Sequence, residues 1–455
     1  MTLEGDLRAA VGDPHVLVDP AVTASYETDW TRRFRGRARC VVRPGSTDDV
    51  VAVMQTCAVH GIPVVPQGGN TGLVGGGVPV DGEVVLSTTR LRHIGPVDLA
   101  AGRVIVGAGV TVAALQQSAR AHDLDFGVDL ASRDSATIGG LVATNAGGVN
   151  VIRYGGMREQ VSGIEAVLAD GSVIRRLDAL PKDNTGYDLA GLLPGSEGTL
   201  AVVTAVRVRL WPRLKKRAIA LLAVDSTAAA VDALDALRLR LPAIESAELF
   251  LADGLALVRA HTGLPVPVPG DHAAYLLVEV ASREDPTDDL YAALEAAAEA
   301  VPGIDDVVIG ADGPSRERLW RYREAHTESI GAAGIPVKLD IVLPRASLDQ
   351  GLRELPDAVR RVSPGARTVM FGHLGEGNVH VNVLDADDAH AVTDAVLRYV
   401  AACGGSISAE HGIGRAKVGW LSLTRSPDEI AAMRAIKRAL DPQGLLNPGV
   451  ILAAD

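Results

Sequence analysis

Cysteine is scarce in this chain of 455 residues, which contains only Cys40, Cys57 and Cys403. The three residues lie far apart in the sequence and lack the paired spacing of a metal site. A disulfide framework is therefore excluded. We expect the cysteines to be small core residues that remain thiols in a reducing compartment.

Long hydrophobic runs and an excess of basic residues are missing too. No apolar stretch approaches the ~20 residues that a helix needs to cross a bilayer. The N-terminus, MTLEGDLRAAVGDP, is acidic and mixed, unlike a secretory signal. The formal net charge of −12 argues against a nucleic-acid-binding surface, which would be basic. We therefore expect a cytoplasmic protein with no transmembrane segment and no nucleic-acid partner.

The composition that remains is typical of globular domains. Hydrophobic residues make up 47% of the chain and charged residues 22%, whereas a disordered chain would have fewer apolar residues. The length is sufficient for two or three domains, each with its own core.

Glycine is abundant, with 49 residues, and it clusters in three runs. These are PVVPQGGNTGLVGGGVP (63–79), SATIGGLVATNAGGVNVIRYGG (135–156) and PGSEGTLAVVT (194–204). Each run adjoins β-branched residues, so we expect tight turns between strands. Successive backbone N–H groups in such loops bind anions, phosphates above all. Glycine-rich turns are often purely structural, but three together favour a phosphate-bearing ligand.

Two common phosphate-binding motifs are absent. The chain has no G-x-x-x-x-G-K-[ST] sequence, which argues against a P-loop NTPase. No G-x-G-x-x-G sequence joins a strand to a helix, which disfavours a nicotinamide-binding Rossmann domain. The phosphates would have to be bound by another fold.

The stretch RPGSTDDVVAVMQTCAVHGIPVVPQGGNTGLVGG resembles the pyrophosphate loop of FAD-binding proteins of the vanillyl-alcohol oxidase type. In these proteins a strand, an amphipathic helix (here ended at Gly61) and a glycine loop follow one another. DLASRDSATIGGLVATNAGG and GSEGTLAVVTAVRVRL resemble the second and third flavin-contacting segments of the same family. The resemblance implies that the backbone of residues 68–72 binds the diphosphate.

The residues that the resemblance places around FAD are Gly68, Gly69, Asn70, Thr71, Gly72, Asp129, Ser135, Gly139, Gly140, Thr144, Asn145, Gly147, Gly148, Gly198 and Asn447. Several relatives bind flavin covalently through a histidine after the paired glycines. This chain has Asn70 there, so the flavin is expected to be held non-covalently.

The second half of the chain alternates strand-like and helix-like segments. WPRLKKR (211–217) interrupts the preceding pattern with proline and charge, which suits a domain boundary. Beyond it the alternation predicts an antiparallel sheet with helices on one face, so the fold class is α+β. We expect an FAD-binding domain at 1–212, a substrate or cap domain at 213–405, and a C-terminal segment at 406–455 that returns to the flavin.

Two histidines lie close together in FGHLGEGNVHVNV (371–383). If Glu376–Gly377 is a two-residue hairpin turn, His373 lies opposite His380 on one face, with Cβ atoms roughly 4.5–5.5 Å apart. Asn382 points to the same face. An isolated pair of this kind is more often part of a protein core. The segment SAEHGIG adds Glu410 and His411, and two histidines with one carboxylate are the usual ligands of a catalytic metal ion.

This constellation resembles the metal-dependent branch of the FAD-linked D-2-hydroxyacid dehydrogenases, over roughly residues 20–452. The resemblance implies a metal site of His373, His380 and Glu410, for Zn²⁺ or alternatively Mn²⁺ or Fe²⁺. It implies substrate contacts from Asn382 and His411, with His411 as the general base. It also assigns Arg323, Thr327 and Lys338 to the substrate carboxylates. Arg323 and Thr327, four residues apart, are expected on one helical face.

The expected activity is oxidation of a D-2-hydroxyacid, D-2-hydroxyglutarate in the first place, with hydride transfer to flavin N5. Threonine at position 327 favours the five-carbon diacid, because relatives acting on D-lactate or glycolate tend to have a bulky residue there. The electrons would pass to an acceptor such as an electron-transfer flavoprotein or a quinone.

Three alternatives remain open at the level of sequence. The same chemistry could act on D-lactate or glycolate. A flavin oxidase of sugars or phenols would not need the two histidines and Glu410. A non-catalytic flavin-binding subunit of an oxidase complex would not need the metal and carboxylate sets. A homodimer is one of the assemblies that the sequence leaves open.

Overall fold

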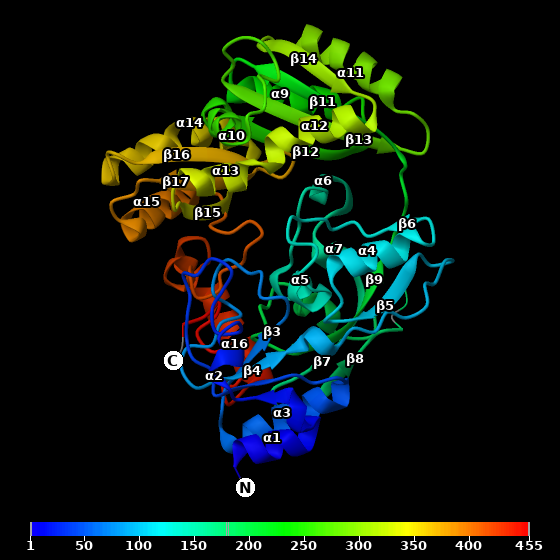
Figure 1. The fold of residues 1–455 in the computed structure, drawn as a ribbon, viewed down its shortest axis with the longest axis vertical. Coiled ribbons are helices and arrows are strands. Elements are labelled where there is room, and N and C mark those ends of the chain that lie inside the picture. Colours follow the sequence, from blue (N-terminus) through cyan, green and yellow to red (C-terminus); the bar gives the residue numbers. More distant parts are fainter. Residues whose placement is uncertain (1, 179, 181, 454–455) are drawn as a thin grey trace. The chain divides into compact units, whose positions relative to one another are not determined.

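The computed structural model describes residues 2–178, 180 and 182–453, and the chain divides into two compact units (Figure 1). The first unit comprises Met1–Gly148, Tyr154–Arg213 and Glu410–Asp455, and the second comprises Val149–Arg153 and Leu214–Ala409. The division after Arg213 lies next to the boundary expected after residue 212. The return to the first unit at Glu410 falls within the expected C-terminal segment.

Two four-stranded sheets and a short strand pair organise the first unit. One sheet has the order β1-β2-β4-β3, with β2 and β3 parallel to β4, and the other, β5-β9-β7-β8, is antiparallel. The strands are β1 (Val16–Leu17), β2 (Cys40–Val42), β3 (Val64–Gln67), β4 (Val84–Ser87), β5 (Arg103–Gly107), β6 (Leu124–Asp125), β7 (Val161–Val167), β8 (Val173–Arg175), β9 (Val202–Arg209) and β10 (Trp211–Pro212).

Helix α3 (Thr47–His60) is the amphipathic helix expected before the glycine loop. Its first turn is capped by the side chain of Ser46, which accepts from the N–H of Asp49, and it ends at Gly61 in the left-handed conformation, as predicted. The unit's other helices are α1 (Leu3–Val11), α2 (Pro20–Thr23), α4 (Val112–Arg120), α5 (Ile138–Thr144), α7 (Met157–Gln160), α8 (Leu189–Leu192) and α16 (Pro427–Leu440), with 3₁₀ helices at Asp13–His15, Thr88–Arg90 and Val418–Leu423.

The apolar face of α3 fixes the position of the glycine loop. Val50, Val53 and Met54 are fully buried against the same core as Val64 of β3. Since β3 ends at Gln67, the loop that begins at Gly68 leaves a strand that is held by its parallel pairing with β4 and by this core.

A single seven-stranded antiparallel sheet forms the centre of the second unit (Figure 1). Its order is β14-β11-β13-β12-β16-β17-β15, and every neighbouring pair is antiparallel. The strands are β11 (Lys216–Val224), β12 (Ile244–Leu251), β13 (Ala274–Ser282), β14 (Ile304–Gly310), β15 (Val337–Val342), β16 (Arg367–His373) and β17 (Asn378–Leu384). The expected antiparallel sheet is confirmed.

Helices cover both faces of this sheet, not one face as the sequence led us to expect. On one face, Leu255, Leu319, Trp320 and Ile330 from three helices pack against strand residues such as Phe250. On the other, Leu348 and Leu352 lie against Leu249 and Met370. The reason is that β11 and β13 are buried along nearly their whole length, so both faces need an apolar cover.

The helices of the first face are α10 (Ala252–Thr262), α12 (Gly313–Glu324) and α13 (His326–Ala333), and those of the opposite face are α9 (Thr227–Arg238) and α14 (Arg345–Val362), with α11 (Thr287–Ala300) and α15 (Ala389–Ala402) packed beside them. Helix α6 (Val151–Tyr154) lies where the chain passes between the units.

The cysteines are free thiols, as predicted. Cys40 and Cys57 are fully buried, and burial raises the pKa of each thiol to about 12. Cys403 is half-buried. Within the described ranges, no helix combines the length and apolar character needed to span a membrane.

Candidate functional site

The first group of expected site residues is the glycine loop after β3, in the first unit. A side chain at Gly69 would place its Cβ 1.9 Å from the backbone oxygen of Ser135, and one at Gly68 would place it 2.3 Å from the hydroxyl of Thr137. Only glycine therefore allows the loop to lie against the segment at 135–140. The structure thus brings together the first two flavin-contacting segments that were predicted.

The backbone of this loop offers unused donors. In the described part of the chain, the N–H groups of residues 69–72 donate to no backbone or side-chain oxygen. A Cβ at Gly72 would meet no atom within 4 Å, so the space beside it is open. Asn70 has a positive φ of 53°, and its Nδ2 donates to the carbonyl oxygen of Thr28 at 2.8 Å. Consecutive free N–H groups beside open space suit a diphosphate.

The second glycine segment is equally close-packed. Asp129 and Gly148 form a parallel β-bridge, and a Cβ at Gly148, where φ is 96°, would lie 1.9 Å from the oxygen of Asp129. The Asp129 carboxylate accepts from Gln116 at 3.2 Å and lies 3.0 Å from Arg133. The other residues expected around FAD in this part of the first unit are Ser135, Gly139, Gly140, Thr144, Asn145 and Gly147.

Asn447, in the C-terminal segment of the first unit, is hydrogen-bonded to the third glycine run (194–204). Its Nδ2 donates to the carbonyl oxygens of Gly76 and Glu197, both at 2.8 Å. The side chain is buried, and its Oδ1 has no hydrogen-bond partner in the described part of the chain. A buried orphan acceptor beside Gly76 of the glycine loop suits an N–H donor of a bound ligand. The residues present therefore fit FAD.

Glu197, next to Gly198, was not predicted as a site residue. Its carboxylate accepts from the N–H groups of Ile413 at 2.7 Å and Gly414 at 2.8 Å. Burial raises the pKa of this carboxyl group to about 7, against the lowering effect of the two N–H donors and of Lys417. A carboxylate within the glycine run at 194–204 is the signal by which it could have been noticed.

In the second unit, His373 and His380 lie on the same face of the sheet, with ring centroids 5.2 Å apart. The predicted register was wrong by two residues: His373 pairs with Asn378, and His380 pairs with Phe371. The turn has four residues between β16 and β17, where we expected two. A shift of two residues leaves side chains on their original face, so the histidines still meet.

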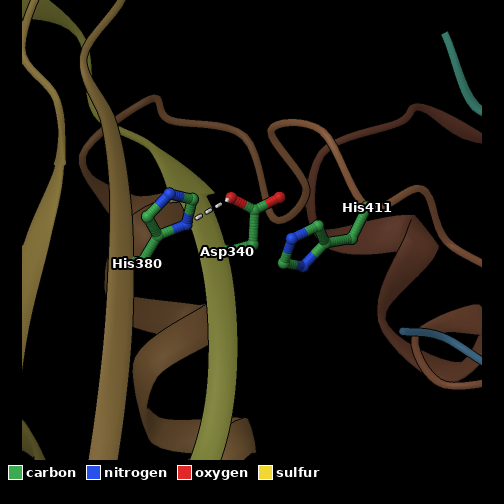
Figure 2. A group of neighbouring side chains, drawn as sticks. All are labelled: Asp340, His380 and His411. Carbon is green, nitrogen blue, oxygen red and sulfur yellow. Dashed lines mark ion pairs between the residues drawn. The ribbon is translucent and has the colours of Figure 1, made fainter. Parts of the chain in front are cut away.

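Each histidine contacts a buried carboxylate through its Nδ1 atom. His373 Nδ1 lies 2.6 Å from Oε1 of Glu248 on β12, and His380 Nδ1 lies 3.3 Å from Oδ1 of Asp340 on β15 (Figure 2). Both carboxylates are completely buried and stand directly opposite their histidines on neighbouring strands. An imidazole held at Nδ1 presents Nε2 as the atom that can bind a metal ion.

Arg323 lies beside this cluster. Its Nε is 2.7 Å from Oε2 of Glu248, and its guanidinium carbon is 4.5 Å from the ring centroid of Phe371. Burial alone would raise the pKa of Glu248, but the charges of His373 and Arg323 lower it overall. Glu248 is therefore a carboxylate that orients two side chains at once.

Arg323 and Thr327 do not share a helical face, which corrects the prediction. Helix α12 ends at Glu324 and α13 begins at His326, so the two residues belong to different helices. Arg323 is buried, whereas Thr327 is exposed. The periodicity of WRYREAHTESIG gave no sign of this break, because Ala325 is a good helix former.

Lys338 and Asn382 are opposite each other on β15 and β17, on the same face as His380. The Asn382 Nδ2 donates to the carbonyl oxygen of His380 at 3.3 Å. Burial lowers the pKa of Lys338, which is half-buried. The structure thus gathers four predicted residues, His373, His380, Asn382 and Lys338, with Arg323 at the edge of the group.

Glu410 and His411 begin the C-terminal part of the first unit. The Oε1 of Glu410 accepts from the N–H of Gly148 at 2.6 Å, which ties it to the second glycine segment. The preceding residue, Ala409, donates its N–H to the Asp340 carboxylate at 3.2 Å within the second unit. The residue directly before Glu410 is therefore bound to Asp340.

Glu248 and Asp340, like Glu197, are site residues that the sequence prediction missed. Glu248 lies in the strand sequence ESAELFL, which also contains Glu245, and Asp340 is the single carboxylate of PVKLDIVLP. Carboxylates are almost never fully buried unless they are paired. That rule would have marked both as partners of a cation or a histidine.

The chain resembles known flavoproteins along nearly its whole length. Residues 213–451 match the family described as FAD linked oxidases, C-terminal domain, and residues 38–176 match an FAD binding domain. A mitochondrial D-2-hydroxyglutarate dehydrogenase of Bos taurus is 38% identical over 98% of this chain and 83% of its own length. A D-2-hydroxyglutarate dehydrogenase of Xanthomonas citri pv. viticola is 38% identical over 97% of this chain and 95% of its own.

A solved structure of p-cresol methylhydroxylase with substrate bound superposes with a TM-score of 0.79. Its sequence is 18% identical, and the match covers 99% of this chain and 96% of that one. At this identity the likeness shows the fold alone. It confirms the predicted vanillyl-alcohol oxidase-type fold.

We predict that Glu197 makes the protein less stable as the pH rises from about 5 to 7. Its pKa is 4.5 ordinarily and about 7 when folded, so in this window the folded protein holds a proton that the unfolded chain releases. The stabilisation that this proton gives to the folded state is fully present below pH 4.5. It is lost as the pH rises through 7, which lowers the free energy of unfolding by up to about 3 kcal/mol. Thermal unfolding at pH 5 and at pH 8 should show a larger decrease in Tm with rising pH for wild type than for Glu197→Gln. Equal losses would contradict the prediction.

Proposed function

The chain belongs to the family of FAD-linked oxidases, and we propose that it is an FAD-dependent dehydrogenase that oxidises D-2-hydroxyglutarate to 2-oxoglutarate. The observation that carries the proposal is its likeness over 97–98% of its length to D-2-hydroxyglutarate dehydrogenases at 38% identity. FAD, when bound in the first unit, supplies the flavin N5 position that accepts the hydride from C2 of the substrate.

The flavin in this proposal is held without a covalent bond. The residue after the paired glycines is Asn70, whose amide donates to the backbone of Thr28. A carboxamide is a poor nucleophile, unlike the imidazole found at this place in relatives with covalent flavin. The diphosphate is assigned to the free N–H groups of residues 69–72, and the Oδ1 of Asn447 to an N–H donor of the cofactor.

A divalent metal, Zn²⁺ or alternatively Mn²⁺ or Fe²⁺, is proposed at His373, His380 and Glu410. The contacts of the two Nδ1 atoms with Glu248 and Asp340 support it, because metal-binding histidines usually give their second nitrogen to a carboxylate. Glu410 directly follows Ala409, whose N–H donates to the Asp340 carboxylate. The metal would supply a Lewis acid that lowers the pKa of the substrate hydroxyl.

The side chains of this protein would then perform the remaining steps. His411 removes the proton of the 2-hydroxyl group as general base. Asn382 donates to the substrate near C1. Arg323, Lys338 and Thr327 hold the carboxylates through charge-assisted hydrogen bonds. The Nε atom of Arg323 lies 2.7 Å from Oε2 of Glu248. The N–H donors on the two terminal nitrogens of the guanidinium are those assigned to the substrate.

The electrons leave for a second acceptor, for which an electron-transfer flavoprotein or a quinone is proposed. Cytoplasmic location is part of the proposal, and the free thiols of Cys40 and Cys57 support a reducing compartment.

The metal site is tested with His380→Ala. Loss of one ligand should remove the bound metal and most turnover, while the FAD content stays the same because FAD is assigned to the first unit. Elemental analysis and the visible flavin spectrum of the purified variant measure both quantities. His122→Ala, a change at an exposed histidine of the first unit, is the matched control and should retain metal and activity. Full activity of His380→Ala would show that the histidine pair is only part of the core.

The substrate is tested by steady-state kinetics with an artificial electron acceptor. A buried charge-assisted hydrogen bond contributes roughly 1.5–3 kcal/mol, so D-2-hydroxyglutarate should exceed D-lactate in kcat/KM by at least about tenfold. Lys338→Ala should reduce this preference, mainly through KM. Thr327→Trp should depress the diacid more than lactate. Glu328→Trp puts the same indole on the neighbouring exposed position and should leave the ratio unchanged. A wild-type preference for lactate would move the assignment to a D-lactate dehydrogenase.

A further inference from the structure

The most unusual carboxylate of the first unit is that of Glu197, which accepts hydrogen bonds from two backbone N–H groups. Its two oxygens accept separately, Oε1 from the N–H of Ile413 and Oε2 from the N–H of Gly414. These donors lie two and three residues after His411. Glu197 is only 8% exposed, so the two hydrogen bonds are formed away from water, where they are strongest.

The backbone of Glu197 is itself fixed on both sides. Its N–H donates to the carbonyl oxygen of Ala143 at 2.7 Å, and its carbonyl oxygen accepts from Asn447 Nδ2 at 2.8 Å. Its φ of 50° lies in the left-handed region, which is costly for a residue with a side chain. In this strained backbone conformation the carboxylate points at the segment that follows His411.

That segment is shaped to receive it. Gly412 has a φ of 83°, and a Cβ there would lie 2.6 Å from Oε1 of Glu197. Gly414 has a φ of 53°, and its Cβ would lie 2.2 Å from the carbonyl oxygen of Val74 in the glycine loop. The N–H of Arg415 donates to the same carbonyl at 2.9 Å. Residues 412–415 are therefore seated between Glu197 and the loop assigned to the diphosphate.

We propose that Glu197 is a positioning residue for the reaction: it fixes the turn after His411 and thereby holds His411 and Glu410 in the geometry that proton removal requires. The inference rests on the proposed function. Glu197 does not touch the substrate in this scheme. It acts through the backbone of Ile413 and Gly414, in the way that a rigid support keeps a general base within about 0.5 Å of its productive place.

A buried carboxylate that binds N–H groups also has a purely structural role, in which it only holds two segments together. The two roles differ in what a substitution changes. A structural role affects how much folded, FAD-loaded protein is obtained. A positioning role affects the rate per bound FAD, with little change in KM, because a misplaced base is felt in the transition state.

The test compares Glu197→Ala and Glu197→Gln with wild type, each as purified holoprotein, using D-2-hydroxyglutarate and D-lactate. Glu197→Ala should lower kcat per bound FAD by at least about tenfold, with KM within about twofold. Glu197→Gln keeps one acceptor oxygen and should recover part of the rate. Hydrogen exchange should be faster at the amides of Ile413 and Gly414 in Glu197→Ala, a readout that is independent of turnover.

Glu165→Gln is the matched control. Glu165 is another buried carboxylate of the first unit, bound by Thr204 at 3.0 Å and paired with Arg175. This change should lower stability and leave the rate per bound FAD unaltered. An unchanged kcat or unchanged amide exchange in Glu197→Ala would overturn the positioning role while leaving the proposed function intact. A wild-type protein that oxidises no 2-hydroxyacid would overturn both.

Discussion

The burial of two carboxylates in the centre of a sheet is the constraint on which the candidate site depends. Glu248 and Asp340 have no exposed surface, and an isolated ionised carboxylate in such surroundings would be highly unfavourable. Each is compensated by the histidine directly opposite it, and Glu248 also by Arg323. The carboxylates need their partners, and the partners are thereby fixed in orientation. Because the buried carboxylates must be paired, His373, His380 and Arg323 are held in fixed orientations on one face of the sheet.

In the first unit, charge is bound by backbone N–H groups. A diphosphate needs several donors in a small space, and side chains would obstruct them. Gly68 and Gly69 let the loop lie directly against the segment at 135–140, and in the described residues the N–H groups of residues 69–72 donate to no protein oxygen. Glu197 uses the same kind of donor, backbone N–H, in the opposite sense: there a side-chain anion of the protein binds the segment that carries Glu410 and His411.

Local patterns predicted most of the secondary structure and the shared face of His373 and His380. Ser46 and Gly61 bound the helix before the glycine loop, because caps are encoded by single residues. The placement of His373 and His380 on one face of the sheet survived an error of two residues in the register, because strand faces alternate with period two. Features that depend on distant contacts were not predictable. The break at Ala325 has no local sign, whereas the second layer of helices is indicated by the continuous apolar runs of β11 and β13.

The roles of Glu248 and Asp340 could not be derived from sequence because they arise from strand order. Glu248 precedes His373 by well over a hundred residues in the chain, and only the pairing of β12 with β16 brings them together. The same holds for Glu197 and Ile413. In each case the sequence shows a carboxylate in apolar surroundings, and the fold supplies its partner.

The central claim is that the two oriented histidines bind a metal ion through their Nε2 atoms. A crystal structure of the purified holoprotein, with anomalous difference maps measured at the absorption edges of zinc, manganese and iron, tests this most directly. We expect one strong peak about 2.0–2.2 Å from the Nε2 atoms of both His373 and His380, with Nδ1 of each still on its carboxylate. A fully active protein whose map has no peak there would contradict the claim, as would a metal bound through Nδ1.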